Sequence, residues 1–421
     1  MTWTEKKLID LSRLRLREYS RCFLRRNPFP STAIPEEVPP VTVDRDSIIR
    51  HFQDVVAQLY QDGASTVTVL VGEYGSGKSH LLKVFKHSTN SQLLQLEEPS
   101  LAVYIKSPGR NFLDFVFAVI EDLGRSLLTD YSNRVIEDFI SQHWSRSEHY
   151  IYDSEVREEF KNKRIGIDSL LRSSTTRDLF SDIKHERFSG VRNFDLVSAF
   201  LFLSHPDFSS IAWRWFLGQK LSREERDEIV VDSALTEPKE AYSVFQSLVE
   251  LLHLLGVKSL VLLIDELEKI VLISALLRSQ YQDDLRHLID DNPKAMGVFF
   301  AIAGAQWNLL TREPTALQRR LAGNIYLLDR FDERRIKDLI AAYLDQHRTE
   351  GYSPGSIRRR FPHCPAELCP FTEESVNVIL EKSDGTLSSV IMLCRKALDY
   401  FLDHVDDYEA ITGELVASIA K

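Results

Sequence analysis

The sequence contains few cysteines and no long apolar run. Only 4 of its 421 residues are cysteine, which is too few for a disulfide framework and favours a reducing, cytoplasmic location. No hydrophobic run approaches the roughly 20 residues of a membrane-spanning helix, so we expect no membrane association. Residues 1–26 are basic and amphipathic, with no continuous apolar segment and no small-residue cleavage site, which excludes a secretory signal.

The sequence also lacks an excess of positive charge. Its formal net charge is −10 at pH 7, which argues against a protein that holds nucleic acid through overall charge but leaves room for local basic patches. Residues 5–26 predict a helix with a basic face. That face can contact DNA phosphates or pack on a neighbouring subunit, and the acidic balance of the chain favours subunit packing. Its arginines are Arg13, Arg15, Arg17, Arg21, Arg25 and Arg26.

The chain does have enough apolar material for a large core. Hydrophobic residues make up 43% of it, and its length indicates roughly two or three domains. Residues 1–40 predict a basic helix and a proline-rich arm, residues 41–331 an α/β domain, and residues 332–421 a helical domain. Residues from about 130 to 240 are charged, rich in aromatics and without strand patterns, and predict a helical insertion.

Apolar runs alternate with helical patterns through the middle domain. Such alternation predicts an α/β fold with a parallel sheet and helices on both faces. The predicted strands are residues 66–71, 100–108, 258–270, 294–305 and 324–331.

The first functional signal is the segment GEYGSGKSH, residues 72–80. Gly72, Gly77, Lys78 and Ser79 match the spacing G-x-x-x-x-G-K-[ST] of a phosphate-binding P-loop. The segment lies between a predicted strand and a predicted helix, which is the context that this motif requires. The alternative is a glycine-rich turn that binds nothing, and both flanks argue against it.

This motif predicts a site for ATP and Mg²⁺. Glycines let successive backbone N–H groups point at one phosphate, and the helix N-terminus adds its partial positive charge. We expect Lys78 to contact the β- and γ-phosphates and Ser79 to coordinate Mg²⁺. The predicted nucleotide-binding residues are Gly72, Glu73, Tyr74, Gly75, Ser76, Gly77, Lys78, Ser79 and His80.

A second signal follows the apolar run at residues 260–264. Asp265 and Glu266 come directly after it, at the carboxyl end of a predicted central strand, where open α/β sheets bind ligands. We expect Asp265 to hold Mg²⁺ and Glu266 to act as the general base that orients the attacking water. Glu268 is expected to point elsewhere. The alternative is a solvated charge cluster at a strand end, which the upstream P-loop makes weaker.

Polar residues after the next strand are further candidates for catalysis. Gln306 is better placed than Asn308 to reach the γ-phosphate, although amides in such positions also cap helices. Arg319 and Arg320 precede the last predicted strand, and an arginine there can stabilise the transition state on a neighbouring subunit. Either arginine can equally form a surface salt bridge.

Two other patterns have plain structural interpretations. The segment FPHCPAELCP at residues 361–370 contains a histidine and two cysteines, but the spacing fits no common zinc site and a fourth ligand is missing. The Trp-Arg-Trp segment at residues 213–215 can stack on bases. Alternating aromatics are more often one buried face of an element, with the arginine outside.

In this order, the motifs resemble the AAA+ ATPases, most closely the clade of the origin-recognition ATPases and the STAND switches. The resemblance covers roughly residues 40–400 and includes VDRDSII, a segment whose family counterpart packs near the adenine. GEYGSGKSHLL, WRWFLGQ and the pattern from Gly256 to Lys269 are also similar to the ATP-binding proteins of BREX-type phage-defence systems. The resemblance implies ATP hydrolysis, a C-terminal helical lid and work in a DNA-directed or phage-defence complex.

One position departs from the AAA+ pattern. AAA+ lids usually carry a nucleotide-sensing arginine in a G-x-P-R-like turn. Here Leu387 and Ser388 stand where proline and arginine are expected after Gly385, and Arg395 lies two helical turns later. This departure puts nucleotide sensing by the lid in doubt.

Three functions are compatible with these motifs. The first is an ATP-hydrolysing protein that forms a homo-oligomer in its ATP state and acts on a partner protein, with DNA as a further candidate partner. The second is a monomeric switch that ATP holds closed and that hydrolyses slowly. The third is a scaffold without hydrolysis. The complete set of Lys78, Ser79, Asp265 and Glu266 argues against the scaffold, and the altered lid turn favours the switch.

Overall fold

The computed structural model describes residues 17–31, 41–94, 96–235, 240–291, 296–312 and 316–420, and the chain forms two compact units. The first, which we call the P-loop unit, combines the chain up to Ser47 with Gly72–Leu81 and with the chain from Leu328 onward. The second, the sheet unit, consists of Ile48–Val71 and Leu82–Leu327. Each unit has a hydrophobic core of its own.

A five-stranded sheet forms the centre of the sheet unit, with the strand order β2-β3-β4-β1-β5. β2, β3 and β4 run parallel, so that Leu262 of β3 lies between Val103 of β2 and Val298 of β4. β3 is buried along its whole length, which explains its unbroken apolar sequence. The strands are β1 (Thr66–Gly72), β2 (Ser100–Ile105), β3 (Ser259–Ile264), β4 (Met296–Ala303) and β5 (Ile325–Leu328).

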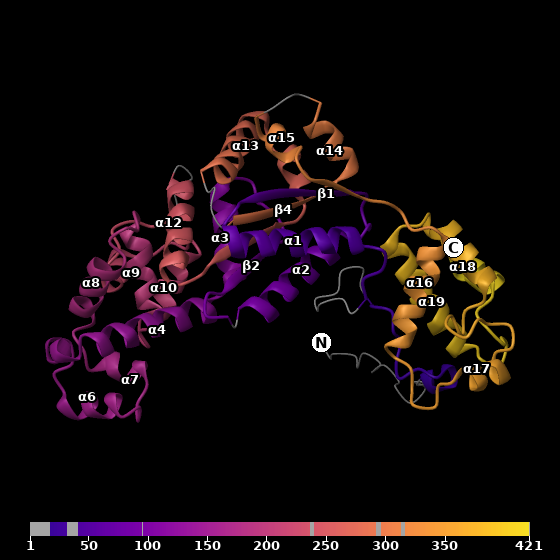
Figure 1. Ribbon diagram of the computed structural model, residues 1–421, viewed down its shortest axis with the longest axis horizontal. Coiled ribbons are helices and arrows are strands. Elements are labelled where there is room, and N and C mark those ends of the chain that lie inside the picture. Colours follow the sequence, from indigo (N-terminus) through magenta and orange to yellow (C-terminus); the bar gives the residue numbers. More distant parts are fainter. Residues whose placement is uncertain are drawn as a thin grey trace, which may run out of the picture. The chain divides into compact units, whose positions relative to one another are not determined.

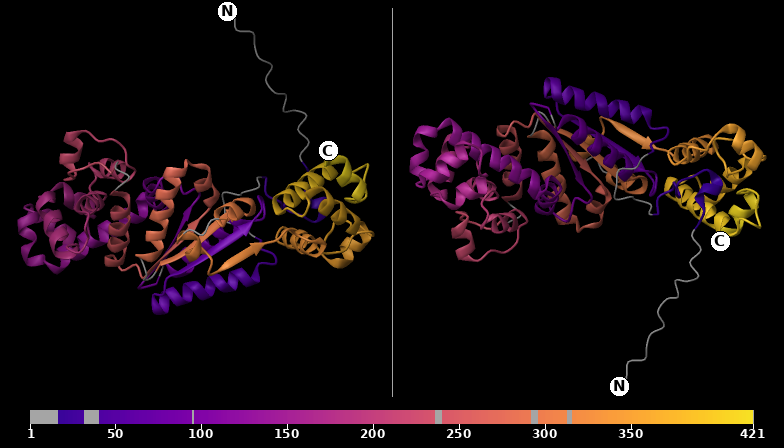
Figure 2. Two further views of the ribbon diagram at one scale, coloured as in Figure 1. Left: turned by 90° about the horizontal axis from the view of Figure 1, so that it is seen from above. Right: turned by 90° about the horizontal axis from the view of Figure 1, so that it is seen from below.

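Helices cover both faces of this sheet, as Figures 1 and 2 show. The helices are α1 (Asp46–Asp62), α2 (Lys78–Leu93), α3 (Phe112–Leu123), α12 (Ala241–Leu254), α13 (Ala275–Asp290), the 3-10 helix η5 (Leu267–Leu272), α14 (Gly304–Leu310) and α15 (Ala316–Leu321). One face of the sheet packs on α1 and α2, and the other face packs on α3, α12 and α13.

The side chains of β4 alternate between these two helical layers, as the pleat of a strand requires. Phe299 packs on Phe52 of α1 and Phe85 of α2, at ring-centroid distances of 5.3 and 5.8 Å. Phe300 belongs to the core that α3, α12 and α13 share. The predicted fold class, a parallel sheet with helices on both faces, is therefore confirmed.

The chain between α3 and α12 forms only helices and connecting segments within its described residues, as predicted for the helical insertion. These helices gather at one end of the sheet (Figure 1). α4, α8 and α10 pack against α9, which is buried from Leu196 to Phe202. Their bounds are α4 (Arg125–Gln142), η3 (Trp144–Arg146), α5 (Ser147–Tyr150), α6 (Ser154–Lys161), α7 (Ile167–Arg172), α8 (Thr176–Arg187), α9 (Phe194–Phe202), α10 (Ser209–Phe216) and α11 (Arg223–Glu228).

The Trp-Arg-Trp segment lies in α10 and stabilises the insertion. The indole N–H of Trp215, a side chain that is 1% exposed, donates a hydrogen bond to the carbonyl oxygen of Ser233 at 2.8 Å. Arg214 forms an ion pair with Glu225 at 2.6 Å. Trp213 packs half-buried against the core. These contacts support the structural interpretation of the segment.

The P-loop unit contains the C-terminal helices. They share one core, in which Tyr343 and Phe401 are buried. Among the described residues, no helix of either unit is long and apolar enough to cross a membrane. The helices are η2 (Tyr19–Cys22), α16 (Glu333–Asp345), α17 (Pro354–Arg360), α18 (Glu373–Ser383), α19 (Leu387–Asp403) and α20 (Gly413–Ile419).

The predicted basic helix at residues 5–26 is wrong for residues 17–26, and its earlier part lies outside the described residues. Residues 17–26 contain only the short 3-10 helix η2. The backbone leaves the helical path because its groups bond to the segment that follows α16 instead. The N–H of Arg25 donates to the carbonyl of His347 at 2.8 Å, and the carbonyl of Phe23 accepts from Thr349 at 2.9 Å.

Side chains of this N-terminal segment also belong to the C-terminal bundle. Phe29 is 1% exposed and lies against the rings of Tyr343 and Phe371. Arg17, on the predicted basic face, forms ion pairs with Asp399 at 3.2 Å and Asp403 at 2.7 Å. This arginine therefore stabilises its own chain.

The two cysteines of the FPHCPAELCP segment are buried in the P-loop unit. The thiol of Cys364 donates to the carbonyl of Pro370 at 3.3 Å. No group of three or more metal-ligating side chains is found in the described part of the chain.

Candidate functional site

The P-loop connects β1 to α2 and encloses a buried lysine. The Lys78 side chain returns to the loop, where its ammonium donates to the carbonyls of Gly72 at 2.7 Å and Glu73 at 2.9 Å. Lys78 is 7% exposed. A buried cation in this position is ready to bind phosphate, because phosphate oxygens can replace the two carbonyl acceptors.

Two glycines shape the loop for a close approach. Gly75 and Gly77 have φ values of +79° and +98°, which residues with a Cβ rarely adopt. A Cβ at Gly75 would also lie 2.2 Å from Oγ of Ser388, and one at Gly77 would lie 2.9 Å from Leu387. The glycines are thus required both by the backbone and by the start of α19, which lies directly on the loop.

The start of α19 is also hydrogen-bonded to the loop. The N–H of Ser388 donates to the carbonyl of Gly75 at 3.1 Å. Ser388 and Leu387 therefore occupy the lid position that faces the P-loop, where the sequence shows no arginine. Arg395 lies elsewhere, because its guanidinium donates to the carbonyl of Phe29 at 2.6 Å.

A narrow apolar pocket adjoins the loop. Val43 and Arg45 of the predicted adenine-packing segment line it together with residues of the P-loop and the C-terminal helices. Its free space is about 20 Å³, enough for a water molecule. The lining residues are Val41, Thr42, Val43, Arg45, Gly77, His80, Leu81, Phe331, Leu339, Tyr343, Leu387 and Ile391.

Arg45 and His80 give this pocket its polar groups. The guanidinium of Arg45 donates to the carbonyls of Ser76 at 3.3 Å and Asp329 at 3.4 Å. His80 hydrogen-bonds through Nε2 to the hydroxyl of Thr42 at 3.1 Å. Burial, with a smaller effect of Arg45, lowers the pKa of His80 to about 4, so the imidazole is neutral at pH 7.

The residues of the P-loop fit a nucleotide phosphate. The hydroxyl of Ser76 is buried and has no hydrogen-bond partner among the described residues, which is unusual for a buried polar atom. Gly75 and Gly77 leave a cradle that a Cβ would fill. Ser79 is the second residue of α2, directly after Lys78, and supplies the oxygen type that Mg²⁺ prefers. Tyr74 is 67% exposed, with its ring 5.8 Å from the Lys78 ammonium.

The sheet unit carries the predicted acids at the end of β3. Asp265 is 3% exposed. Its Oδ2 accepts a hydrogen bond from the hydroxyl of Tyr104 at 2.8 Å, and its Oδ1 accepts from the N–H of Glu266 at 2.9 Å. Tyr104, on the neighbouring strand β2, fixes the carboxylate, and no sequence pattern had indicated it.

Glu266 has a strained backbone. Its φ of 52° and ψ of 40° lie in the left-handed region, which a residue with a Cβ rarely occupies. Such strain concentrates at functional sites, where the surrounding fold maintains it. The Glu266 carboxylate forms an ion pair with Lys269.

Glu268 points elsewhere, as the sequence predicted. It is 5% exposed, and its carboxylate accepts a hydrogen bond from the N–H of Ala303, at the end of β4, at 3.2 Å. This contact joins η5, the segment after the acids, to the strand end from which α14 begins.

Gln306 lies in α14, which packs against η5. Its side-chain oxygen is buried and has no hydrogen-bond partner among the described residues. Asn308, the weaker candidate, is exposed. An unpartnered amide oxygen near the strand ends is compatible with the predicted sensing role, which stays a prediction.

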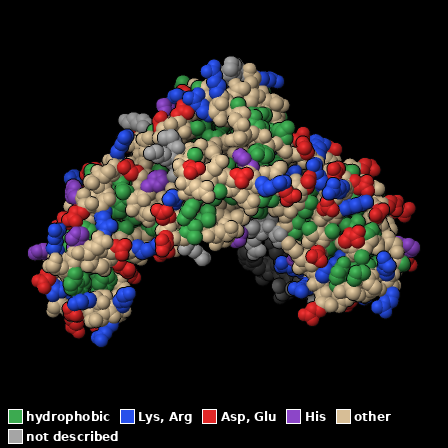
Figure 3. Space-filling model, viewed as in Figure 1, with side chains coloured by type: hydrophobic (Ala, Val, Ile, Leu, Met, Phe, Trp, Pro, Cys, Tyr) green, Lys and Arg blue, Asp and Glu red, His purple; other side chains and the backbone are tan. Residues whose placement is uncertain are grey.

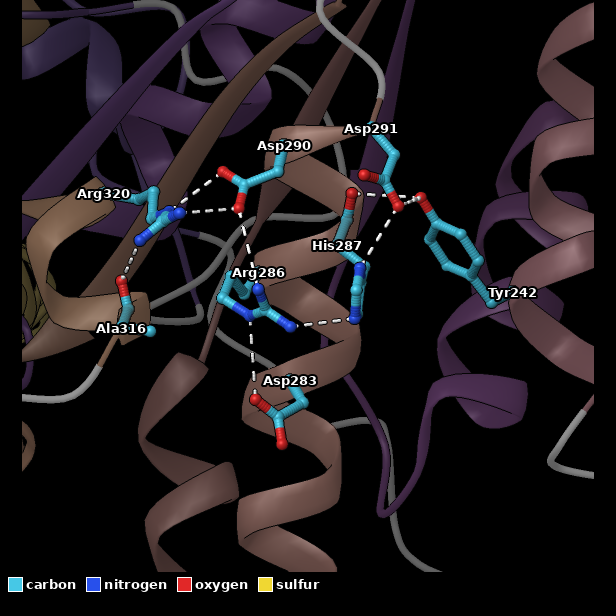
Figure 4. A network of polar contacts seen from close by, with 8 residues as sticks. All are labelled: Tyr242, Asp283, Arg286, His287, Asp290, Asp291, Ala316 and Arg320. Atoms are coloured by element: carbon cyan, nitrogen blue, oxygen red, sulfur yellow. Dashed lines mark hydrogen bonds and ion pairs between the residues drawn. The ribbon is translucent and has the colours of Figure 1, made fainter.

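The two candidate arginines have different environments, although both lie in α15. Figure 4 shows Arg320 bound to Asp290 through two hydrogen bonds of 2.9 and 2.7 Å. This contact holds the pKa of Asp290 below its usual range, and Asp290 also lies near Arg286. Arg319 is exposed and forms no ion pair or hydrogen bond with the described residues. The salt-bridge alternative therefore describes Arg320, and Arg319 is the better candidate for action on a neighbour.

This chain is similar to one protein-family model and to several solved structures. A family model described as BREX system ATP-binding protein BrxC/D matches residues 206–351, a stretch that includes Asp265, Glu266 and both arginines. A search of curated proteins finds no match.

Solved structures share the architecture at low sequence identity. The ORC2 protein of Aeropyrum pernix, solved as ADPNP–ADP complexes, has a TM-score of 0.50 and 12% identity over 93% of this chain and 70% of its own. The ORC1 protein of the same organism, in complex with DNA, has a TM-score of 0.46 and 12% identity over 92% of this chain and 67% of its own. At this identity, the likeness to the ORC2 protein shows a shared fold and nothing about ligands.

Proposed function

We propose that this chain, a BREX-like AAA+ P-loop protein, binds ATP with Mg²⁺ and hydrolyses it. The observation that carries the proposal is the P-loop itself, in which a buried lysine lies on two loop carbonyls inside a glycine cradle. The BrxC/D family match and the nucleotide in the ORC2 structure support ATP as the ligand.

Residues of the P-loop unit would bind the nucleotide. The loop N–H groups and Lys78 would hold the phosphates, as oriented amides and a cation do in other anion sites. The apolar pocket beside Arg45 and His80 would take the base. Because its free space is about 20 Å³, which is below the size of an adenine ring, we expect α19 to move outward as the nucleotide binds.

Residues at the end of β3 would support hydrolysis. Asp265 and Ser79 would hold Mg²⁺, which when bound neutralises charge that develops on the phosphates. Glu266 would orient the attacking water and accept its proton. The amide of Gln306 would report on the terminal phosphate. The P-loop follows β1 and the two acids follow β3. In the sheet, β4 lies between these two strands.

Calorimetric titration with Mg-ATP tests the binding step. Lys78→Ala should weaken binding by about 10- to 100-fold, because charge-assisted hydrogen bonds contribute about 1.5–3 kcal/mol. Lys396→Ala is the matched control, since that lysine is exposed on α19. If Lys78→Ala binds Mg-ATP as tightly as the unaltered chain, the P-loop is not the nucleotide site.

We further propose that the ATP state assembles into a homo-oligomer that acts on a partner protein in a multi-component, cytoplasmic phage-defence or DNA-directed system. The exposed Arg319 carries this proposal, because an arginine finger needs a phosphate from another subunit. The BrxC/D match supports the setting. Light scattering on Glu266→Gln should show a defined larger mass with Mg-ATP and a monomer without it.

DNA is the weaker candidate partner. On the face drawn in Figure 3, basic and acidic side chains are interspersed, and neither sign forms a continuous band. Repeating the light scattering with duplex DNA tests this candidate.

A monomeric switch is the alternative, and one contact favours it. The start of α19 is hydrogen-bonded to the P-loop within a single chain, so the lid can respond to nucleotide without a neighbour. An unchanged monomer mass with Mg-ATP, together with slow phosphate release, would support the switch over the oligomer.

A further inference from the structure

Arg330 bridges the P-loop and the lid turn inside the P-loop unit. It follows β5, and its guanidinium donates to the carboxylate of Glu73 at 2.6 Å. The same guanidinium forms an ion pair with Asp384, in the turn before α19. No sequence motif includes this arginine, because its partners are distant in the chain.

Glu73 lies between two cations. Its backbone carbonyl accepts from the Lys78 ammonium at 2.9 Å, while its carboxylate accepts from Arg330. A single residue therefore separates Arg330 from the lysine expected to hold the β- and γ-phosphates. To contact an anion bound beside Lys78, the Arg330 guanidinium would have to turn away from the Glu73 carboxylate.

The lid supplies no arginine of its own at this point, since Leu387 and Ser388 face the loop glycines. We propose that Arg330 takes the place of the lid arginine: the nucleotide's γ-phosphate displaces the Glu73 carboxylate from the Arg330 guanidinium. This inference rests on the proposed function, because it requires ATP at the P-loop.

The exchange is favourable on physical grounds. The side chains of Arg330 and Glu73 are 46% and 64% exposed, and exposed ion pairs contribute little because water and salt screen them. A terminal phosphate carries more charge than a carboxylate and accepts two parallel hydrogen bonds from a guanidinium. The Glu73 carboxylate thus acts as a competing anion that holds Arg330 beside the loop.

The position of Arg330 is coupled to the lid through the next residue. The N–H of Phe331 donates to the carbonyl of Gly385 at 2.8 Å. Gly385 has a φ of +65°, and a Cβ there would lie 2.3 Å from the Phe331 carbonyl oxygen. A shift of Arg330 toward phosphate would therefore pull on the turn that starts α19.

Equilibrium titration with ADP and with the β,γ-imido analogue of ATP, both with Mg²⁺, tests this proposal. Arg330→Ala should bind the triphosphate analogue about 10- to 100-fold more weakly and change ADP affinity by less than about threefold. Glu73→Gln should have the opposite effect, with analogue binding tighter by up to about fivefold, because the competing carboxylate is gone. Arg330→Lys should recover part of the lost analogue affinity, because lysine keeps the positive charge but lacks the planar guanidinium that donates two parallel hydrogen bonds.

The control is Arg334→Ala, an arginine whose side chain is 90% exposed and pairs only weakly with Asp338; it should leave both affinities unchanged. If Arg330→Ala weakens ADP and analogue equally, or neither, the inference is wrong while the P-loop site stands. If the unaltered chain binds neither nucleotide, the proposed function itself fails. Should Arg330→Ala not fold, an unchanged analogue affinity in Glu73→Gln would by itself contradict the proposal.

Discussion

The two units hold their candidate functional residues in contrasting ways. In the P-loop unit, the ammonium of Lys78 and the guanidinium of Arg45 each donate hydrogen bonds to backbone carbonyls of the same unit. In the sheet unit, Glu266 has a strained backbone, the side-chain oxygen of Gln306 has no partner in the described part of the chain, and Arg319 is exposed. Strained and unpartnered groups persist where function requires them. This contrast indicates that substitutions of Lys78 or Arg45 should weaken nucleotide binding. Substitutions of Glu266, Gln306 or Arg319 should slow hydrolysis instead.

The adjacent arginines offer the largest test of this contrast. Arg319→Ala should lower turnover by about 10³-fold or more while ATP binding is retained, because an arginine finger acts only in the transition state. Arg320→Ala should lower thermal stability, since it removes the two hydrogen bonds to Asp290, and turnover of the folded protein should change little. Phosphate release and melting temperature measure both. Equal loss of turnover in the two variants would remove the distinction between them.

The two acids near β3 sharpen the contrast within the sheet unit. Glu266→Gln should lower turnover by about 10²- to 10⁴-fold, the usual contribution of a general base. Glu268→Gln is the matched control, because the amide still accepts the hydrogen bond from Ala303 and the residue points away from the acids' ligand. Single-turnover phosphate release compares the two variants, and a similar loss in both would argue against Glu266 as the base.

Acid should weaken the P-loop unit through His80. The pKa of this imidazole is about 4 in the folded chain, against about 6.5 for a histidine in the unfolded chain, because burial disfavours its charged form. The stabilisation is fully present above pH 6.5 and is lost as the pH falls toward 4, by at most about 3 kcal/mol. Urea unfolding at pH 7 and pH 4.5 should show a smaller loss for His80→Gln than for the unaltered chain. The exposed His149, changed to Gln, is the control.

The smallest expected effect concerns the glycine cradle. Gly75→Ala should destabilise the chain by about 1–3 kcal/mol, because alanine is strained at a φ of +79° and its Cβ would collide with Ser388. It should also weaken nucleotide binding. Gly351→Ala is the matched control, since a Cβ there meets nothing within 4 Å. Thermal unfolding compares them, and equal stability of the two variants would show that the start of α19 does not lie firmly on the loop.

Local spacing was enough to predict much of this molecule. The P-loop lies between β1 and α2, and the acids follow β3, because both signals consist of neighbouring residues whose apolar flanks define the strands. The parallel sheet followed from the alternation of strands and helices. The roles of these site residues stay predictions.

Contacts between distant residues could not be predicted in the same way. Arg320 pairs with Asp290, Asp265 is held by Tyr104, and these partners lie 30 and 161 residues apart. The N-terminal helix was mispredicted over residues 17–26 because its backbone bonds to residues near 348, which the local pattern does not show. The hydrophobic periodicity of a segment shows only its own preference for a helix or a strand, and tertiary contacts can override this preference.

The most direct measurement determines Mg-ATP affinity and phosphate release together, for the unaltered chain, Lys78→Ala and Glu266→Gln. We expect Lys78→Ala to lose both Mg-ATP affinity and turnover, whereas Glu266→Gln should keep its Mg-ATP affinity and lose turnover alone. If Glu266→Gln loses affinity as severely as Lys78→Ala, or releases phosphate at the unaltered rate, the division between a binding half and a hydrolytic half is contradicted.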